Sequence, residues 1–492
     1  MNRNNIWIHV GLATVLIVFA AVLGEIERWK TALTAHDAVP RKTFERKNDL
    51  PATVSSVPEV IVRFKPGVTV EQIRAIASAN NDTLSDEIES VNGLAVIDDL
   101  DNAAAQSVVA QYAAMSNVEY AEPNLEIKLD DPIQKEIERD FAFSEPMLDE
   151  EGKCIRNCAV EHPNDPMFSE QWALNNSGAD GGMKGADLDA LKAWETTKGS
   201  DEVVVAVLDS GVDYTHVDLM SNMWTRPANV PAYTDDELGA FNDINGYDAT
   251  SEIRDPMDDN GHGTHCAGII GAEGDNGEGI AGINWNVKIM PLKFLGRGGF
   301  GSTNDAIEAI NYAIDRKKNG VNVRVISASW GSTSKSKALE DTIRAAGDAG
   351  ILFVAAAGND GSDNDRRPHY PSNYDLPNVI SVAALDRTDH LASFSNFGVK
   401  TVHVAAPGKA IISTWLGSDY REASGTSMAT PYVSGVAALI IASEPRISMK
   451  NLRERILKTA DKLDALNGKV ASSGRICAAN ALGNIVKSHV HD

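Results

Sequence analysis

Apolar and polar positions divide the chain into two regions with different secondary-structure patterns. In the first region, short strand-like segments alternate with two helical ones, and Thr69-x-x-Gln72 has the form of a capping box. The order βαββαβ, over about 70 residues, predicts a small α+β domain of the ferredoxin-like type. Its expected elements are strand 60–64, a helix from Thr69 to about Ala79, strands 84–88 and 94–97 around a turn at Asn92-Gly93, helix 103–115 capped by Asn102, and strand 118–123.

From Asn164 onward, continuous apolar segments alternate with helical patterns. Strands that are apolar on both faces are buried between layers of helices, so the pattern predicts an α/β domain with a mostly parallel sheet. In such sheets, ligands bind at the carboxyl ends of the strands. The expected strands are 203–208, 288–292, 323–327, 351–355 and 379–382, and the expected helices between them are 304–317 and 335–349.

A run of small apolar residues, 432–442, predicts one more buried helix after a polar loop, 418–424. Pro431 fits the first turn of that helix, where a missing N–H costs little. Ser427 then lies at a helix N-terminus, where backbone N–H groups and the helix dipole stabilise negative charge. Taken alone, a serine at this position is more often a helix cap than a nucleophile.

The N-terminal residues 1–24 have the pattern of a targeting segment. Arg3 precedes an uncharged apolar run, 10–24, which is about 15 residues long and short of the ~20 that span a bilayer. We expect a signal peptide, and the weak cleavage site at 22–24 leaves a membrane anchor as the alternative. Residues 25–57 show no periodicity and are interpreted as a linker. The acidic segment 131–163 also breaks the pattern, which makes it the expected maturation region.

Composition narrows the possible functions. The chain has 492 residues, of which 43% are hydrophobic and 23% charged, as in a globular protein with a large core. Its net charge of −24 argues against nucleic acid as a partner, because phosphate binding needs a basic face. Cys154 and Cys158 are close enough in sequence to form a disulfide in an exported protein. Cys266 and Cys477 lie in apolar surroundings and are expected to be buried thiols.

Three further motifs contain catalytic residue types, and two of these motifs follow expected strands. A serine nucleophile needs a base, and the base needs an orienting group. Asp209 follows strand 203–208 and is a candidate orienting group. His262 and His265 are rival bases in one glycine-rich motif, and chemistry alone does not choose between them. Asn359, after strand 351–355, has an amide suited to an oxyanion, although Asp and Asn at such positions are more often turn residues.

These motifs together resemble those of the subtilisin-like serine proteases, the subtilases. The resemblance covers roughly 164–482, and the order Asp, His, Asn, Ser is that of the family. It implies that Ser427 is the nucleophile, His262 the base, Asp209 the orienting acid and Asn359 an oxyanion donor, with His265 structural. The cysteine directly after the second histidine makes this motif similar to that of the proteinase K and thermitase branches. The motifs are Leu208-Asp209-Ser210-Gly211, Asn260-Gly261-His262-Gly263-Thr264-His265-Cys266, Ala356-Ala357-Gly358-Asn359-Asp360 and Gly425-Thr426-Ser427-Met428-Ala429-Thr430-Pro431.

The resemblance implies a domain order and a function. A ferredoxin-like propeptide domain, 58–130, would precede a subtilisin-like catalytic domain, 164–488. Such a propeptide is an intramolecular inhibitor whose tail, here 123–130, lies in the cleft as an extended strand. We therefore expect a serine endopeptidase made as a zymogen, secreted or periplasmic, that hydrolyses protein or peptide substrates. The alternatives are a catalytically silent subtilase-like peptide-binding protein and an α/β-hydrolase lipase. The lipase is disfavoured because Ser427 follows a threonine and comes last.

Substrate subsites follow from the same resemblance. Ser329-Trp330-Gly331 would pair with the substrate backbone on one side and 296–300 on the other. Trp330 and Phe300 would line apolar subsites, or only pack. The pocket for the residue before the scissile bond would be walled by 329–331 and 356–358, which include Ala357 and Gly358. His369 falls near its base and argues against a simple preference for large apolar residues.

A structural calcium ion is also implied, since calcium takes several oxygen ligands in flexible loops. Asp255, Asp258 and Asp259, just before the histidine motif, are interpreted either as a second cation site or as a solvated acidic loop. The implied ligands of the first site are Asp165, Asp218, the side chain of Asn276 and the carbonyl oxygens of Glu273, Glu278 and Ile280.

Overall fold

The computed structural model describes residues 59–129, 133–135, 162–235, 239–240, 243–250 and 254–483. The expected targeting segment 1–24, the linker 25–57, most of the acidic segment 131–163 and both Cys154 and Cys158 lie outside these ranges, as do residues 484–488 of the expected catalytic domain.

The small domain has the predicted βαββαβ order, and its antiparallel sheet has the strand order β2-β3-β1-β4. The capping box of Thr69 and Gln72 is confirmed. Asn102 as a helix cap is wrong, because it lies in the left-handed region (φ 54°) and the helix starts only after Ala104. The elements are β1 (Glu59–Phe64), α2 (Val70–Ala79), β2 (Asp82–Glu87), β3 (Leu94–Asp99), α3 (Ala105–Ala113) and β4 (Val118–Pro123).

The large domain is built on a nine-stranded sheet that is parallel except at its last strand, as the apolar pattern predicts. Each predicted strand is present, within a few residues at its ends. In spatial order the strands are β10 (Tyr247–Asp248), β11 (Asn286–Lys293), β7 (Gly199–Asp209), β13 (Val323–Ala328), β14 (Leu352–Ala356), β15 (Val379–Leu385), β16 (Val404–Pro407), β20 (Gly474–Arg475) and β19 (Asp461–Lys462).

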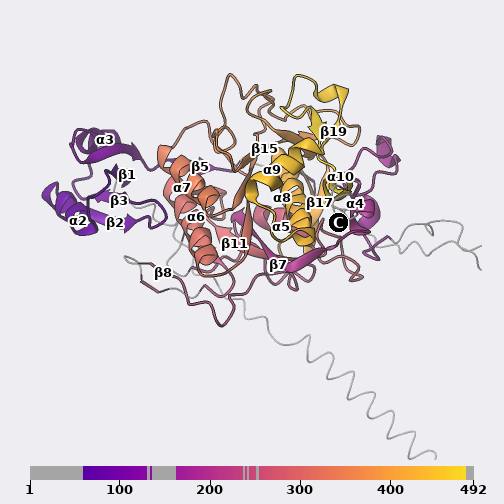
Figure 1. The fold of residues 1–492 in the computed structure, drawn as a ribbon, viewed down its shortest axis with the longest axis horizontal. Coiled ribbons are helices and arrows are strands. Elements are labelled where there is room, and N and C mark those ends of the chain that lie inside the picture. The colour runs from indigo at the N-terminus through magenta and orange to yellow at the C-terminus, as the bar shows by residue number, and fades with distance from the viewer. Residues whose placement is uncertain are drawn as a thin grey trace, which may run out of the picture. The chain divides into compact units, whose positions relative to one another are not determined.

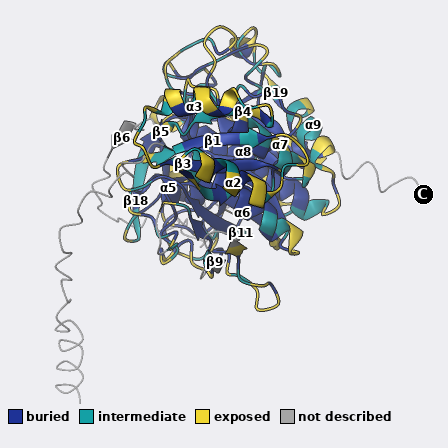
Figure 2. Cartoon of the chain, turned by 90° about the vertical axis from the view of Figure 1, so that its left-hand side faces the viewer, coloured by how far each residue is buried: buried dark blue, intermediate teal, exposed yellow. Residues whose placement is uncertain are grey.

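Helices cover both faces of this sheet (Figure 1). Along β7, Val203, Val205 and Val207 pack with α5 (His262–Gly271) and α8 (Thr426–Ser443). The alternate side chains, 204, 206 and 208, pack with α6 (Thr303–Lys318) and α7 (Lys337–Asp348). The strands are therefore buried on both sides, which Figure 2 shows as a dark blue interior.

Shorter helices are α4 (Ala190–Trp194), α9 (Met449–Lys458) and α10 (Ala478–Gly483), with 3₁₀ turns at Phe168–Glu170, Ala179–Gly181 and Asp464–Leu466.

The predicted polar loop 418–424 is wrong, because β17 (Ile411–Trp415) and β18 (Asp419–Ser424) form an antiparallel hairpin there. Only Tyr420 and Ala423 of β18 are buried, so its apolar alternation is too short to separate it from a loop. A further strand, β6 (Ile133–Lys135), pairs with β18. The remaining strands are β5 (Glu126–Lys128), β12 (Phe300–Ser302), β8 (Thr234–Asp235) and β9 (Gly239–Ala240).

Helix α8 starts at Thr426, so Pro431 lies in its second turn and not in its first. Proline has no N–H for the carbonyl four residues earlier, which is that of Ser427. That carbonyl instead accepts from Ser329 Oγ at 2.9 Å and from Cys266 Sγ at 3.5 Å. Within the described ranges, α8 is the one helix long and apolar enough to cross a membrane, but 89% of that stretch is buried, as in a core helix.

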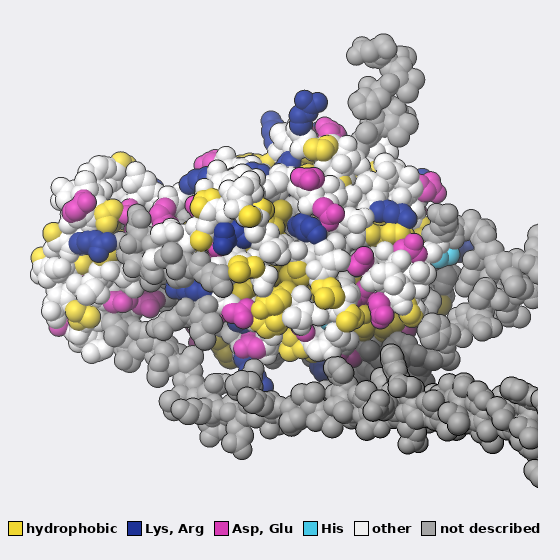
Figure 3. Space-filling view, turned by 90° about the horizontal axis from the view of Figure 1, so that it is seen from below, with side chains coloured by type: hydrophobic (Ala, Val, Ile, Leu, Met, Phe, Trp, Pro, Cys, Tyr) yellow, Lys and Arg dark blue, Asp and Glu magenta, His cyan; other side chains and the backbone are white. Residues whose placement is uncertain are grey.

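Charged side chains lie mostly at the surface, and on the face drawn in Figure 3 acidic and basic groups are interspersed with apolar ones. An exception is Asp243, which is 1% exposed. Its two oxygens contact Arg226 Nε at 2.8 Å and Arg316 Nη1 at 2.9 Å. Because a buried carboxylate is costly unless paired, these two guanidinium groups fix the segment around Asp243 against α6.

Candidate active site

The end of β7 and the start of α5 bring Asp209 and His262 together. His262 Nδ1 lies 2.7 Å from Asp209 Oδ1, and both side chains are fully buried. The backbone N–H of Ser210 donates to the same oxygen at 2.8 Å. Gly263 is required for this approach, since a Cβ there would lie 2.0 Å from the Gly211 carbonyl oxygen and 3.2 Å from Asp209 Cβ. The arrangement is that of an imidazole oriented by a buried carboxylate.

Ser427 lies at the second position of α8, where the first-turn N–H groups are free of helical partners. Its hydroxyl donates to the Ser329 carbonyl at 2.9 Å. Cys266, one turn after His262 on α5, donates to the Ser427 carbonyl, and its sulfur lies within 4.8 Å of the ligand atoms of Asp209 and His262. Burial raises the pKa of the Cys266 thiol well above its ordinary value, so it is a protonated packing partner.

Asn359 is held by Thr426, the residue before Ser427. The Thr426 backbone N–H and hydroxyl donate to Asn359 Oδ1 at 2.8 and 3.0 Å. The hydroxyl of Thr426 also accepts from Gly358 N at 3.1 Å. Because Oδ1 is occupied by these donors, the amide presents its Nδ2 hydrogens on the other side. Sequence reasoning did not identify Thr426 as the group that orients this amide, because a contact across 67 residues leaves no local pattern.

Asp258 is a second residue whose role was not predicted. It is buried and accepts five hydrogen bonds, from Ser210 Oγ, Asn260 N, Gly261 N, Thr264 N and Thr264 Oγ1, at 2.6 to 3.0 Å. Burial raises its pKa. It therefore holds the start of α5 in place, which agrees neither with a solvated loop nor with a cation site. The sequence feature that could have indicated this role is an acidic residue just before the start of a helix.

The other two acids of that segment have separate partners. Asp259 pairs with Lys293 at 2.7 Å, and Asp255 accepts from the Tyr214 hydroxyl at 3.1 Å. Lys293 Nζ also donates to the Ser210 carbonyl at 2.6 Å, so this ion pair supports the loop after Asp209. The three acids do not converge on one point in the structure.

The rival base His265 points away from Asp209. Its Nε2 is hydrogen-bonded to the Arg421 carbonyl at 3.0 Å. Burial lowers its pKa to about 3, so the ring is neutral. The geometry thus separates two histidines that the residues alone did not: His262 faces the carboxylate, and His265 ties α5 to the β18 hairpin.

The segment after the small domain lies as a strand beside the large domain. Strand β5 pairs antiparallel with β12, with Phe300 opposite Lys128, and Leu129 N donates to the Gly299 carbonyl at 2.8 Å. The segment after the small domain therefore pairs with 299–302, which overlaps the range 296–300 that was expected to pair with a substrate. Phe300 is 45% exposed, and the Lys128 ammonium lies 5.3 Å from its ring centre.

Trp330 both packs and lines a pocket. It is 3% exposed, its indole N–H donates to the Leu208 carbonyl at 3.0 Å, and its ring centre lies 4.6 Å from that of Phe294. It also lines a pocket with Ile127 of β5, Thr303, Leu339 and Tyr370. Ser329 and Gly331 flank it; Ser329 holds the Ser427 carbonyl, and Gly331 abuts His369.

The expected pocket walls lie around His369. An ideal Cβ on Gly331 would be 2.0 Å from His369 Cε1, and one on Gly358 would be 2.9 Å from its Cδ2. Ala357 is buried, and its carbonyl accepts from the side chains of Asn364 and Asn396 at 2.8 and 3.0 Å. The wall segment 356–358 is therefore held by side-chain amides, and the histidine ring lies between the two walls.

The residues expected to bind calcium also converge. Asp218 Oδ1 accepts from Asn276 Nδ2 at 2.9 Å, and its Oδ2 accepts from Ile280 N at 3.0 Å. Asp165 Oδ2 accepts from Asp275 N at 2.7 Å, and its Oδ1 has no partner among the described residues. Burial, with a smaller contribution from repulsion by Asp165, raises the pKa of Asp218 to about 7. Burial, with a smaller contribution from repulsion by Asp275, raises the pKa of Asp165 to about 6. Glu273 N donates to the Asp218 carbonyl, and Glu278 N donates to Asn276 Oδ1.

Comparison with known proteins gives two family matches. A model described as the subtilase family (Peptidase S8) matches residues 200–475, and one described as the fervidolysin N-terminal prodomain matches 58–124. The chain is 40% identical over 317 residues to a thermophilic serine proteinase of Bacillus sp. (strain AK1), covering 64% of this chain and 71% of the relative. It is 37% identical over 320 residues to thermitase of Thermoactinomyces vulgaris, covering 65% and 99%. To halolysin of Haloferax mediterranei it is 36% identical over 325 residues, covering 66% and 55%.

Proposed function

The chain belongs to the subtilase family, and on this premise we propose that Asp209, His262 and Ser427 are its catalytic triad, with Asn359 in the oxyanion hole. It is a serine endopeptidase with an N-terminal prodomain. The observation that carries the residue assignment is the 2.7 Å contact between His262 Nδ1 and Asp209 Oδ1, at the strand end beside the N-terminus of α8.

The proposed reaction is acyl transfer through two tetrahedral intermediates. Ser427 Oγ attacks the peptide carbonyl carbon while His262 Nε2 takes its proton. To do so, the hydroxyl gives up its hydrogen bond to the Ser329 carbonyl, which needs only rotation about one side-chain bond. His262 then protonates the leaving amine, and water repeats the sequence on the acyl-enzyme. Asp209 holds the imidazole tautomer and stabilises the imidazolium throughout.

A fluorophosphonate probe tests the assignment directly, because it reacts only with an activated serine. We expect the processed wild-type protein to be labelled at Ser427 and the peptide carrying the label to be identified by mass spectrometry. A catalytically silent peptide-binding relative would bind peptides and take up no label.

Asn359→Ala is expected to lower kcat by about 10²–10³-fold, or ~2.7–4 kcal/mol, the size known for the matching amide of subtilisin itself. The reason is that Nδ2 donates to the oxyanion only as it forms, so KM should change little. Steady-state kinetics on one peptide substrate measure both constants. Asn467→Ala, an exposed asparagine of the same domain, is the control. A loss confined to KM would contradict the oxyanion role.

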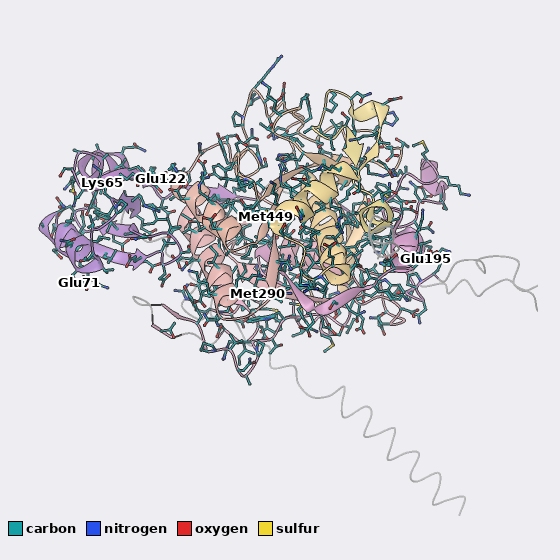
Figure 4. The ribbon with its side chains drawn as sticks, in the orientation of Figure 1. Lys65, Glu71, Glu122, Glu195, Met290 and Met449 are labelled. Carbon is teal, nitrogen blue, oxygen red and sulfur yellow. The ribbon has the colours of Figure 1, made fainter. Side chains whose placement is uncertain are left out.

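We further propose that the prodomain inhibits the protease intramolecularly, through a specific interface between the small domain and the large domain. The Glu122 carboxylate, at the end of β4, accepts from Lys337 N at 2.9 Å and from Ala338 N at 3.2 Å, at the start of α7 (Figure 4). A carboxylate is favoured at a helix N-terminus. Tyr120 donates to Asp341 at 3.0 Å, and Ser90 N donates to Asn311 on α6 at 3.0 Å. These contacts support docking of the small domain on α6 and α7.

The same segment supports a location for self-processing. Strand β5 ends at Lys128 beside β12, and β6 begins at Ile133 beside β18, the strand that leads directly into Ser427. A peptide substrate binds its protease in the same way, as an extended strand that pairs with the enzyme. We therefore propose that the first cut falls between Leu129 and Ile133.

Export is proposed from the N-terminal pattern of residues 1–24, supported by relatives of the extracellular type, including one described as a halolysin-like extracellular serine protease. A membrane anchor is the alternative if that segment is retained. N-terminal sequencing of the exported protein distinguishes the two.

A structural calcium ion is proposed at Asp165 and Asp218, with the loop 273–280. The support is two buried carboxyl groups with raised pKa values, one of which, Asp165, has an oxygen without a partner among the described residues; a bound cation would neutralise both. Asn276 and the carbonyl oxygens of Glu273, Glu278 and Ile280 would complete the oxygen set. The ion would supply folding stability and take no part in the reaction.

Removing calcium is expected to lower the melting temperature, by an amount that depends on pH. A ligand at 100 times its Kd stabilises by about 2.7 kcal/mol. Without the ion, both carboxyls have native pKa values raised above the ordinary 3.8, to about 6 and about 7, so the native state binds extra protons. Stability without calcium should then fall as pH rises from about 4 to about 7. Bound calcium removes this loss of stability, so the fall in melting temperature caused by excess chelator should be largest above about pH 7.

Thermal unfolding followed by circular dichroism, with and without chelator across this pH range, measures the effect. An unchanged melting temperature at neutral pH would contradict the calcium site, and a chelator effect that is largest in acid would contradict the ligand assignment.

A further inference from the structure

The His369 ring fills the gap between two backbone walls beside the proposed catalytic centre. It is 4% exposed. Its Cε1 edge abuts Gly331, where a Cβ would approach to 2.0 Å, and its Cδ2–Nε2 edge abuts Gly358, where a Cβ would approach to 2.9 and 3.0 Å. Only glycine fits at either wall. Gly358 directly precedes Asn359, and Gly331 lies two residues after Ser329, so the ring borders the centre itself.

The backbone holds this ring in place. His369 N–H donates to Asn373 Oδ1 at 3.1 Å, and its carbonyl accepts from Ser372 Oγ at 2.7 Å. The next residue, Tyr370, exchanges two backbone hydrogen bonds with Ser332, each 2.7 Å long. The backbone that carries the imidazole is therefore fixed between the two walls.

The ring offers an unused acceptor. It is hydrogen-bonded to the Ala356 carbonyl, and Nδ1 has no partner among the described residues. Burial lowers the pKa of His369 to about 4 despite the nearby Asp360 carboxylate, which favours the proton, so the ring is neutral at neutral pH. A neutral imidazole that donates through one nitrogen carries a lone pair on the other. A buried acceptor without a donor costs free energy until a donor arrives.

We propose that His369 is a specificity-determining residue, which makes the enzyme prefer peptide bonds that follow glutamine or asparagine. The inference rests on the proposed function and names the substrate class of the same site. The amide N–H₂ of such a side chain donates to Nδ1, whereas an apolar side chain of equal length leaves Nδ1 unpaired. The carboxylate of aspartate or glutamate has no proton to donate to Nδ1. Aromatic side chains are too large, because the ring shortens the pocket.

The test uses peptides that differ only in the residue before the scissile bond, in the matched pairs glutamine with methionine and asparagine with leucine. For the wild type, kcat/KM should favour each amide by about tenfold, the size of one neutral hydrogen bond. His369→Phe keeps a ring and removes the acceptor, so both ratios should fall to one or below. His369→Leu serves if the phenylalanine variant does not fold. His390→Phe, at an exposed histidine, is the control and should keep the wild-type ratios.

Titration with the fluorophosphonate probe distinguishes a failure of the proposed function from a failure of the specificity role of His369. If no serine reacts, the proposed function fails. If the serine reacts fully but the wild type does not discriminate within the matched pairs, or the His369 variants keep the wild-type ratios, this inference is overturned and the proposed function stands.

Discussion

Ser427→Ala is expected to lower kcat by about 10⁶-fold, as removal of the nucleophile does in subtilisin itself. The hydroxyl oxygen forms the covalent bond to substrate, so no neighbouring group replaces it. The variant should fold, because Ser427 Oγ makes one hydrogen bond, to the Ser329 carbonyl, and the loss of one neutral hydrogen bond costs about 1 kcal/mol. Peptide hydrolysis by purified protein, normalised by circular dichroism for folded material, measures the loss.

The same variant tests self-processing. We expect N-terminal sequencing to find the wild type shortened to a start between residues 130 and 133, and Ser427→Ala uncut. Ser177→Ala, at an exposed serine, is the control and should mature like the wild type. Equal maturation of Ser427→Ala when it is expressed alone would exclude self-cleavage, while hydrolysis of peptides by that variant would exclude Ser427 as the nucleophile.

Asp209→Asn is expected to lower kcat by about 10⁴-fold at neutral pH, again a magnitude known from serine proteases. The carboxylate lies 2.7 Å from His262 Nδ1 in a fully buried site, where an uncompensated imidazolium is costly. An asparagine keeps the shape and removes the negative charge. Its N–H₂ group also competes with Nδ1–H as the donor, which favours the wrong imidazole tautomer.

A matched control lies on the same strand. Asp201, near the start of β7, is exposed and pairs with Lys288 at 3.2 Å. Asp201→Asn should leave kcat unchanged, because a surface ion pair far from the site contributes little. If Asp209→Asn retained wild-type kcat, or if both variants lost activity equally, the orienting role of Asp209 would be wrong.

Local sequence signals were sufficient for the strands and helices that have a long or regular apolar pattern. Val203 to Leu208 is apolar at every position. In the structure, alternate residues of this strand pack against different helix layers, so the strand is buried on both faces, which explains why every position is apolar. Thr69 and Gln72 specified a helix start through contacts three residues apart. The apolar run 432–442 indicated a buried helix, although its true start at Thr426 was hidden by Pro431.

Each candidate catalytic residue lies at a junction between elements, and the local pattern marks such junctions. Asp209 ends a strand, His262 starts a glycine-rich helix, and Ser427 starts a buried one. Which residues support them was not readable. Thr426 orients Asn359, Asp258 gathers five donors around the start of α5, and Ser329 takes the place of the N–H that Pro431 lacks.

The sequence by itself determined the alternation of strands and helices in the two regions and the residue types at their junctions, because hydrophobic periodicity and motifs act over a few neighbouring residues. Only the tertiary structure decided that His262 rather than His265 faces the carboxylate, that Asp258 supports a helix and not an ion, and that His369 lies between Gly331 and Gly358. Each of these depends on contacts between segments tens to hundreds of residues apart, and such contacts form only when the whole sheet is assembled.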